Sequence, residues 1–207
     1  DIGFENAGEI FQNPSLSEDL LKQYGAKRNF PAADATSKVS VHLRFGTVGI
    51  RKLVNYAKKN SNKFLRELIW REFFMMLLYH FPHTVTKSFK PKYDQVEWEF
   101  DEDKFKKWCE GKTGFPLVDA GMRELNETGF MHNRVRMLVA SFLIKDLHID
   151  WKIGEAYFAN KLLDYDQAQN IGNWQWVAGS GADGSPYFRV FNPYLQQEKF
   201  DKNFTYI

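Results

Sequence analysis

Helical periodicity bounded by capping residues is the feature that most constrains the fold of this chain. It is clearest in residues 132–146, where apolar side chains recur at the 3.6-residue period of a helix and so share one face. These side chains are Val135, Leu138, Val139, Phe142 and Leu143. No stretch shows the sustained alternation of a β-strand, and no segment repeats. The sequence therefore predicts an all-α fold.

Capping residues and helix breakers predict where the helices begin and end. Ser17, Ser61 and Asp101 each stand just before a helical pattern. Pro116 suits the first turn of another helix, and Gly129 suits the position just past its end. The predicted helices are residues 17–24, 61–81, 101–109, 116–127, 132–146 and 150–163.

Two stretches interrupt the helical pattern and are predicted to be loops. Residues 32–40 are small, polar and rich in Ser and Thr, and residues 164–186 are rich in Gly, Asn, Asp and Trp. The second stretch is too long for a simple connector. Long ordered loops in compact domains are more often functional than not, so we expect the second loop to contribute to a site.

Composition limits the class of protein. The 207 residues, 43% of them hydrophobic, are enough for a single domain over residues 1–207 with a real core. The longest apolar run, residues 73–78, is far too short to span a membrane. The single cysteine, Cys109, allows no internal disulfide, which fits the cytoplasm best. A net charge of +2 argues against a dedicated nucleic-acid coat, so DNA affinity has to come from a local patch.

Glu67, Trp70 and Arg71 are the first candidate site residues. Their i, i+3, i+4 spacing places them on one face of a predicted helix. A carboxylate, a flat ring and a guanidinium on one face can together bind a planar polar group. The alternative is a Glu67–Arg71 surface pair beside a half-buried Trp70, because i, i+4 pairs are common. The spacing alone leaves both interpretations open.

The start of a later predicted helix holds a second candidate site. Asn133, Arg136 and Met137 share one face there, and Arg134 lies beside it. Two arginines at a helix N-terminus suit phosphate oxygens, because the unpaired backbone N–H groups already favour anions. The alternative is ordinary charge at a helix start, although arginine there opposes the helix dipole.

The second predicted loop holds a third candidate site. Asp164 and Asp166 suit a ribose, an arginine or a metal, and metal is the weakest of these because no His or Cys is nearby. Asn170 follows, and then Trp174 and Trp176, of which we expect one to be buried and one to be presented for stacking.

Common catalytic patterns are missing from the sequence. It contains no Gly-rich phosphate loop, no Ser/His/Asp nucleophile motif and no zinc-ligand spacing. The run Thr36–Ser40 offers hydroxyl and N–H groups to a phosphate, but with low specificity. The residues alone thus indicate a helical domain with a stacking, anion-binding pocket.

Taken together, these segments resemble the FAD-binding domain of the photolyase/cryptochrome family, in the family's order and over most of residues 20–200. The matching stretches are TSKVS at Thr36, ELIWREF at Glu67, EGKTGFPLVDAGMREL at Glu110, TGFMHNRVRM at Thr128, ASFLIKDLHIDW at Ala140 and DYDQAQNIGNWQWVAGSGADGSPYFRVFNP at Asp164. The resemblance implies one half of a deoxyribodipyrimidine photo-lyase, truncated by loss of the N-terminal α/β antenna domain and of C-terminal helices. We expect that loss to weaken FAD retention and activity in the isolated fragment.

The resemblance implies FAD as the cofactor. The cofactor-binding positions are Tyr24, Thr36, Ser37, Lys38, Val39, Ser40, Arg71, Arg136, Asp164, Tyr165, Asp166 and Asn170. Arg136 is expected to pair with Asp164. Asn170 is expected opposite flavin N5, because an amide that can donate or accept tolerates N5 with or without its proton.

The resemblance also implies DNA containing pyrimidine dimers as the partner. The DNA-binding positions are Arg28, Glu67, Trp70, Asn133, Arg134, Trp176 and Gln196. The damaged pair leaves the duplex and stacks on Trp70 and Trp176. The implied catalytic positions are Glu67, Asn133, Asn170 and Met137.

Trp98, Trp151 and Trp174 match the family's electron-transfer chain, with core packing as the alternative. Met137 and Trp70 match the class I cyclobutane dimer photolyases better than the other branches.

Two other functions stay open, namely a blue-light signalling receptor that uses the same flavin and a fragment that folds without FAD. We expect a cytoplasmic monomer with no metal and no membrane association.

Overall fold

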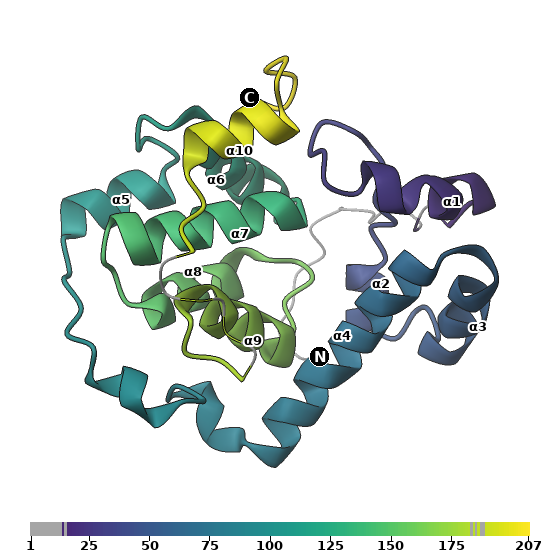
Figure 1. Ribbon diagram of the computed structural model, residues 1–207, viewed down its shortest axis with the longest axis horizontal. Coiled ribbons are helices and arrows are strands. Elements are labelled where there is room, and N and C mark those ends of the chain that lie inside the picture. Colours follow the sequence, from purple (N-terminus) through teal and green to yellow (C-terminus); the bar gives the residue numbers. More distant parts are fainter. Residues whose placement is uncertain (1–13, 15, 183, 185, 187–188) are drawn as a thin grey trace, which may run out of the picture.

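The computed structural model describes residues 14, 16–182, 184, 186 and 189–207, and all regular structure in these residues is helical (Figure 1). The α-helices are α1 (Glu18–Lys27), α2 (Ser40–Arg44), α3 (Ile50–Asn60), α4 (Asn62–His80), α5 (Glu102–Cys109), α6 (Pro116–Thr128), α7 (Asn133–Ser141), α8 (Trp151–Lys161), α9 (Gln167–Ala178) and α10 (Pro193–Phe200). The 3-10 turns are η1 (Pro82–Val85) and η2 (Pro91–Gln95), and the π-helical turn η3 (Phe142–Asp146) continues α7. The predicted all-α class is confirmed.

The predicted helix starts are confirmed by the capping contacts. The side chains of Ser17, Ser61 and Asp101 accept hydrogen bonds from backbone N–H groups in the first turns of α1, α4 and α5. Each cap satisfies a donor that has no partner inside the helix. Gly129 ends α6 in the left-handed conformation, with φ at 65°, as its position predicted.

The second predicted loop is mostly helix, so that prediction is wrong. α9 begins after Asp166, whose side chain accepts a hydrogen bond from Ala168 N at 3.2 Å, and it ends at Gly179 with φ at 82°. Gly172 lies inside the helix, where an added Cβ would stand 2.2 Å from Phe74 Cδ1 on α4. Its glycines therefore serve a close helix contact and a helix end.

Three helices were not predicted. α2 has five residues and α10 has eight, which is too short to show a clear helical period. α3 is different, because Ile50, Leu53, Val54 and Ala57 do follow the i, i+3, i+4, i+7 spacing of a helix and pack in the smaller core, so its pattern was present in the sequence and was overlooked.

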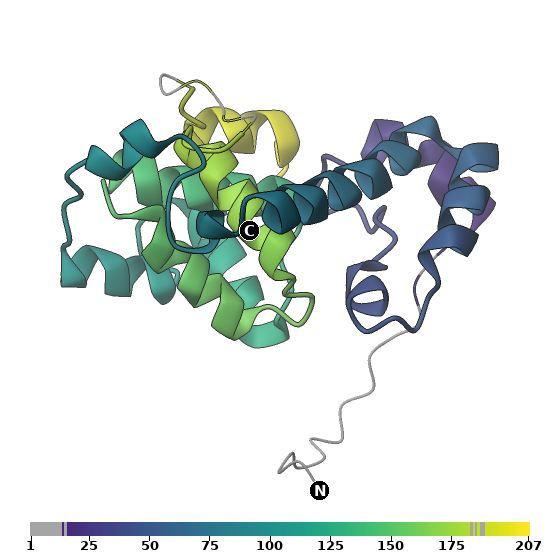
Figure 2. The ribbon, with the colours of Figure 1, turned by 90° about the horizontal axis from the view of Figure 1, so that it is seen from below.

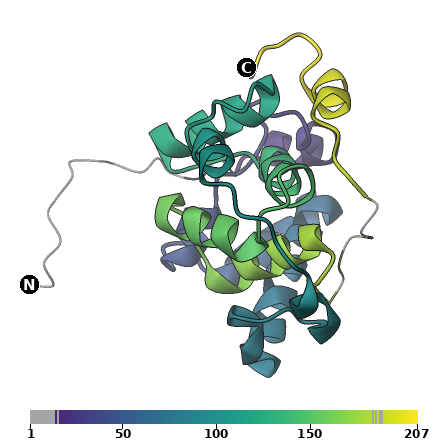
Figure 3. The ribbon, with the colours of Figure 1, turned by 90° about the vertical axis from the view of Figure 1, so that its left-hand side faces the viewer.

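The helices form two groups with separate cores (Figures 1 and 2). In the smaller group, α1 and α3 pack against the first half of α4 around Leu21, Leu53 and Phe64. In the larger group, α5 to α9 pack around a core that includes Trp108 and Trp174, and α10 lies at the edge against α6 (Figure 3). α4 connects the two groups, because its second half contacts α9.

Candidate cofactor and nucleic-acid site

The two groups of helices border a cavity of about 500 Å³. Its walls come from the end of α1, the middle of α4, and α7, α8 and α9, together with residues 164–166 between α8 and α9. A volume of this size is in the range of small-molecule and cofactor sites. Most of the predicted site residues line it, on two sides that differ in chemistry.

Two indoles border the more exposed side of the cavity. Trp70 on α4 is 43% exposed and stacks on Phe74, with ring centroids 6.0 Å apart. Trp176 on α9 is half-buried. Asn133 is exposed at the start of α7, and its Nδ2 lies 3.8 Å from the sulfur of Met137. α4, α7 and α9 thus bring the predicted stacking and hydrogen-bonding side chains to one place.

Glu67 pairs with Arg28, which connects α4 to the end of α1. The alternative of a Glu67–Arg71 surface pair is wrong, because Arg71 Nη1 lies 3.0 Å from Glu72 Oε1 instead. Partial burial acts to lower the pKa of Arg28, but its hydrogen bond to Glu67 and the Glu67 charge outweigh burial and raise it. Glu67 uses Oε1 in this pair, which leaves Oε2 for a ligand.

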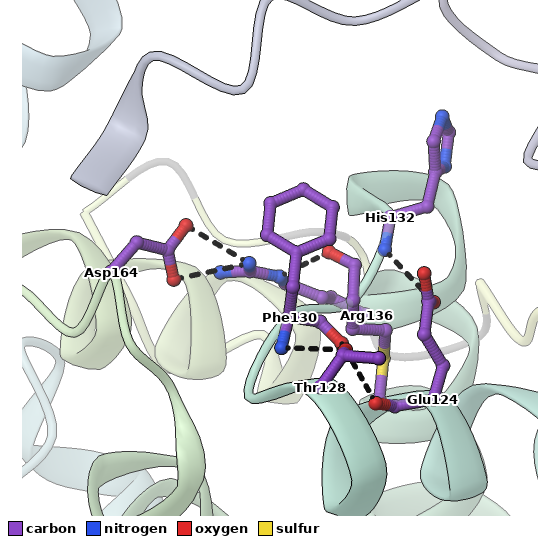
Figure 4. Close-up of polar contacts among 7 residues, drawn as sticks. Glu124, Thr128, Phe130, His132, Arg136 and Asp164 are labelled. Carbon is purple, nitrogen blue, oxygen red and sulfur yellow. Dashed lines mark hydrogen bonds and ion pairs between the residues drawn. The ribbon is translucent and has the colours of Figure 1, made fainter. Parts of the chain in front are cut away.

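Arg136 and Asp164 form the expected ion pair (Figure 4). Arg136 Nη2 donates to the two carboxylate oxygens of Asp164 at 3.1 and 3.0 Å, and the Asp164 side chain is 5% exposed. Arg136 Nε donates to Met131 O at 2.8 Å, and the guanidinium carbon lies 5.4 Å from the Phe130 ring centroid. The carboxylate is therefore held in one orientation at the cavity wall.

A second network fixes the start of α7, and Figure 4 shows its contact between Glu124 and His132. Glu124 Oε2 accepts hydrogen bonds from His132 N, at 3.4 Å, and from the hydroxyl of Tyr206. His132 Nδ1 accepts a hydrogen bond from Arg134 N, at 3.1 Å, and so caps the helix. Burial lowers the pKa of His132 to about 4, so the ring is neutral at neutral pH. Sequence patterns missed Glu124 and Tyr206 because they lie 82 positions apart.

Asn170 is oriented by Glu155, which the sequence patterns did not single out. Asn170 Nδ2 donates to Glu155 Oε1 at 3.0 Å and to Glu155 O at 3.2 Å. Tyr165 OH donates to the same Oε1 at 3.4 Å, and burial, followed by the Glu155 charge, raises the pKa of Tyr165. Because Glu155 occupies Nδ2, the acceptor Oδ1 is the group that Asn170 has left for a ligand.

The tryptophans matched to electron transfer belong to the larger core. Trp174 borders the cavity, is 3% exposed and packs edge-on against Phe158, with centroids 5.1 Å apart. Trp151 is buried in the same core, and Trp98 packs against it partly buried. Because Trp174 is buried and Trp176 is not, the expected division between these two residues is confirmed.

The predicted phosphate-binding residues do not line this cavity. Tyr24 packs edge-on against Phe64, with centroids 5.3 Å apart, and residues 36–40 lead into α2. The charge of Arg44, at the end of α2, lowers the pKa of Tyr165 slightly against the effect of burial. Arg44 is therefore near enough to the 164–166 turn for its charge to act on Tyr165.

Arg134 and Gln196 also lie outside the cavity lining. Burial lowers the pKa of Arg134, and the charges of Arg28 and Arg189 lower it further, so these three arginines form one basic cluster. Arg189 was not among the predicted residues. Gln196 lies on α10, and its buried Oε1 has no partner among the described residues.

Other chemistry finds little support within the described part of the chain. No three His, Cys, Asp or Glu side chains there are grouped so that they could hold a metal ion. None of its helices has both the length and the apolar character of a membrane span. Burial raises the pKa of Cys109 to about 11, so its thiol stays protonated and unreactive at neutral pH.

Comparison with known proteins identifies the family. Residues 64–207 match the family model for the FAD binding domain of DNA photolyase. The chain belongs to this family. Deoxyribodipyrimidine photo-lyases of Agrobacterium fabrum and Escherichia coli are 50% and 44% identical to it, over 97% and 98% of this chain and 43% and 45% of their own lengths. The chain thus spans less than half the length of these photolyases.

Solved structures agree with this assignment. A class III photolyase from Agrobacterium tumefaciens matches with a TM-score of 0.86 at 48% identity, over 91% of this chain and 41% of that one. An archaeal photolyase from Sulfolobus tokodaii with two FAD molecules matches with a TM-score of 0.84 at 50% identity, over 87% of this chain and 42% of that one. A Synechocystis cryptochrome matches with a TM-score of 0.82 at 40% identity, over 91% of this chain and 41% of that one. These matches confirm the resemblance to the helical photolyase domain, while the class I branch stays a prediction.

Proposed function

We propose that this chain is the catalytic part of an enzyme that uses light and FAD to repair cyclobutane pyrimidine dimers in DNA. One observation carries the proposal. A single cavity is bordered by the exposed indole of Trp70 and also by two oriented side chains, the buried carboxylate of Asp164 and the half-buried amide of Asn170. Photolyase relatives at up to 50% identity support the same activity. Because the chain spans less than half of them, the activity of the whole protein is part of this proposal.

The residues present fit FAD. Met137, Ala140 and Phe158 offer apolar contacts to a flat ring, while the Asp164 carboxylate offers acceptors at its polar edge. Gln169 lines the same cavity, and its Nε2 donates to Arg71 O at 2.8 Å, which joins α9 to α4 at this wall. When bound in reduced form, FAD supplies light absorption and the electron that splits the dimer.

Asn170 is the residue with the most specific role toward the cofactor. Glu155 holds its Nδ2, so Oδ1 is presented as the acceptor for a proton at flavin N5. Arg136 fixes the Asp164 carboxylate in the same way. Arg71, Tyr165 and Asp166 also line this side. Tyr24 and residues 36–40 bind the phosphates and sugar in this proposal, provided that FAD extends past α2.

The dimer binds on the exposed side. Trp70 and Trp176 stack on the flipped pair, and Met137 packs against it. Glu67 Oε2 and Asn133 bond its polar edges. Arg28 and Arg134 hold the phosphates beside the dimer. Arg189 also binds these phosphates, because it belongs to the same basic cluster. Gln196 contacts the DNA strand nearby. Trp98, Trp151 and Trp174 carry electrons from the surface to the cofactor.

A second candidate function is blue-light signalling, which the similarity to the Synechocystis cryptochrome favours. Both functions need FAD, so flavin absorbance of the purified protein would exclude the third possibility, a fragment that folds without FAD, and would leave both of these open. They separate on DNA, because only the repair enzyme has to prefer a duplex that contains a dimer and remove the dimer under blue light.

The decisive experiment measures binding of FAD-loaded protein to a duplex with one thymine dimer. Trp70→Ala removes a stacking contact worth about 1–3 kcal/mol, so affinity for that duplex should fall about 5- to 150-fold. Affinity for the undamaged duplex should change little. Tyr79→Ala is the matched control, since Tyr79 is an 82% exposed aromatic on the same helix outside the cavity. Equal losses in the two variants, or equal losses on both duplexes, would remove the stacking role.

A further inference from the structure

Basic side chains cover α3 and the first turns of α4, and the one acidic side chain beside them, Glu67, is paired with Arg28. Residues 44–66 contain seven Lys or Arg and no Asp or Glu, whereas the whole chain has 28 basic and 26 acidic residues. The remainder of the chain is therefore net acidic. The six basic residues on these two helices, all exposed, are Arg51, Lys52, Lys58, Lys59, Lys63 and Arg66. We call these six the α3 basic surface.

The charges of this surface are not neutralised within the described residues, where none of the six forms an ion pair. α5 shows the contrast. Its Lys104 lies 3.7 Å from Asp101 Oδ2, and its first turn carries Glu102 and Asp103. Uncompensated like charges repel one another and are destabilising at helical spacing. A surface of this kind fits a polyanion, because an anionic partner relieves the repulsion.

Helix geometry makes the α3 basic surface continuous with the cavity. On α4, Lys63, Glu67 and Trp70 follow i, i+4, i+7 spacing, so they share one face. Lys63 stands one turn, about 6 Å, before Glu67, which lines the cavity. Lys63 also borders α1, since its Cγ lies 3.3 Å from where a Cβ on Gly25 would stand. The positive surface therefore begins at the edge of the cavity.

The other basic residues extend this surface away from the cavity. On α3, Arg51, Lys58 and Lys59 are exposed, while Leu53 and Ala57 face the smaller core. α3 has 11 residues and is therefore about 16 Å long, which matches about five nucleotides of a DNA strand. Figure 2 shows α3 at the end of the molecule, beside the first half of α4.

We propose that the α3 basic surface is a second DNA-contact surface, which binds phosphates of the duplex beside the damaged pair. The proposal rests on the proposed function, because the DNA is the same duplex whose dimer enters the cavity. Lysines that contact phosphates carry no base information, so this surface raises affinity without changing the preference for a dimer. It also widens the DNA footprint from the cavity to the outer end of the smaller group.

Salt dependence of DNA binding tests this surface. Lys58→Ala/Lys59→Ala removes two neighbouring charges from the last turn of α3. The slope of log K against log salt for an undamaged duplex should become shallower by about 1.8, because each phosphate contact contributes about 0.9. The affinities for dimer-containing and undamaged duplexes should fall by the same factor. Arg51→Ala/Lys52→Ala, at the other end of α3, tests the same change in slope independently.

The chain offers a matched control in Lys106→Ala/Lys107→Ala, which removes two neighbouring exposed lysines from the last turn of α5. Its slope should equal that of the unaltered chain. An unchanged slope in both α3 variants overturns the proposal. So does an unchanged slope combined with lost binding to phosphatidylserine vesicles, which would assign the surface to a membrane. Failure of the proposed function looks different, because the unaltered chain would then bind damaged and undamaged duplexes equally.

Discussion

The two groups of helices contribute to the cavity in different ways. The larger group supplies side chains that buried contacts hold in place, such as Asp164, 5% exposed, and Trp174, 3% exposed. The smaller group and α4 supply Trp70, 43% exposed, and the Arg28–Glu67 pair, whose side chains are 31% and 35% exposed. The part of the cofactor side around Asp164 is therefore preorganised, whereas the part of the DNA side on α1 and α4 can adjust to its substrate.

Core size explains this difference. Among the residues that the structure describes, the smaller core contains six buried apolar residues and the larger one 22. Buried apolar surface is the main source of stability, so local opening should be easiest in the smaller group. A binding surface for a large, deformable partner such as DNA is well placed on the less stable part of the fold.

Asp164→Asn should have the largest effect, because it removes the charged partner of Arg136. Breaking a buried pair from one side costs about 3–5 kcal/mol, and we expect the lower end because the Arg136 side chain is 24% exposed. Urea unfolding and flavin fluorescence titration should show lost stability and lost FAD binding. Glu110→Gln, which breaks the exposed Glu110–Lys112 pair, is the control. If both variants behave alike, the larger group is not preorganised by this pair.

His132, at the start of α7, should make the free energy of unfolding depend measurably on pH. Burial lowers its pKa from 6.5 to about 4, so the unfolded chain takes up a proton in that window while the folded chain does not. The stability contribution is complete above about pH 6.5 and is lost as the pH falls toward 4, by about 3 kcal/mol. His132→Asn keeps a capping oxygen and removes the titration, so its stability profile should be flatter. Parallel profiles for the two proteins would show that His132 does not titrate this way.

Gly172→Ala tests the contact between α4 and α9, where the two groups meet. The new Cβ would stand 2.2 Å from Phe74 Cδ1, and Phe74 supports the indole of Trp70. Overpacking of this kind costs about 1–3 kcal/mol and should also weaken binding of dimer-containing DNA. Gly49→Ala is the control, because nothing lies within 4 Å of its added Cβ. Full dimer affinity in the Gly172 variant would mean that Trp70 does not depend on this contact.

Tyr206→Phe should have the smallest effect, about 1 kcal/mol, because it removes one hydrogen bond to Glu124. Tyr157→Phe likewise removes a hydroxyl that contacts α6, where it bonds Asn126 Oδ1 at 2.6 Å and also Cys109 O at 3.1 Å. The two variants should lose similar stability in thermal unfolding. Only Tyr206→Phe should weaken FAD retention, since Glu124 also holds the start of α7. Equal FAD retention in the two variants would show that the Glu124–Tyr206 hydrogen bond does not support the cofactor side of the cavity.

Sequence patterns predicted what depends on near neighbours. Ser61 and Asp101 cap helices through contacts three residues away, so their signals are local. Gly172 was misleading, because a glycine required by a close helix contact looks like a loop glycine until the partner helix is known. α9 was therefore predicted as a loop.

The site depends on contacts that no local pattern contains. Arg28 and Glu67 are 39 positions apart, and Asn170 and Glu155 are 15 apart. Periodicity could place Glu67 and Trp70 on one face but could not supply their partners. The resemblance to a known family supplied roles for single residues, such as Asn170, and it did not identify Glu155.

The central claim is that cofactor and dimer share one cavity, and the absorption spectrum of the bound flavin tests it most directly. If the claim holds, saturating a FAD-loaded protein with dimer-containing duplex shifts the flavin bands, and the undamaged duplex does not. Trp70→Ala should need more of the dimer-containing duplex for the same shift. A spectrum that stays unchanged while the dimer-containing duplex is demonstrably bound would contradict the account, because the dimer would then lie away from the flavin.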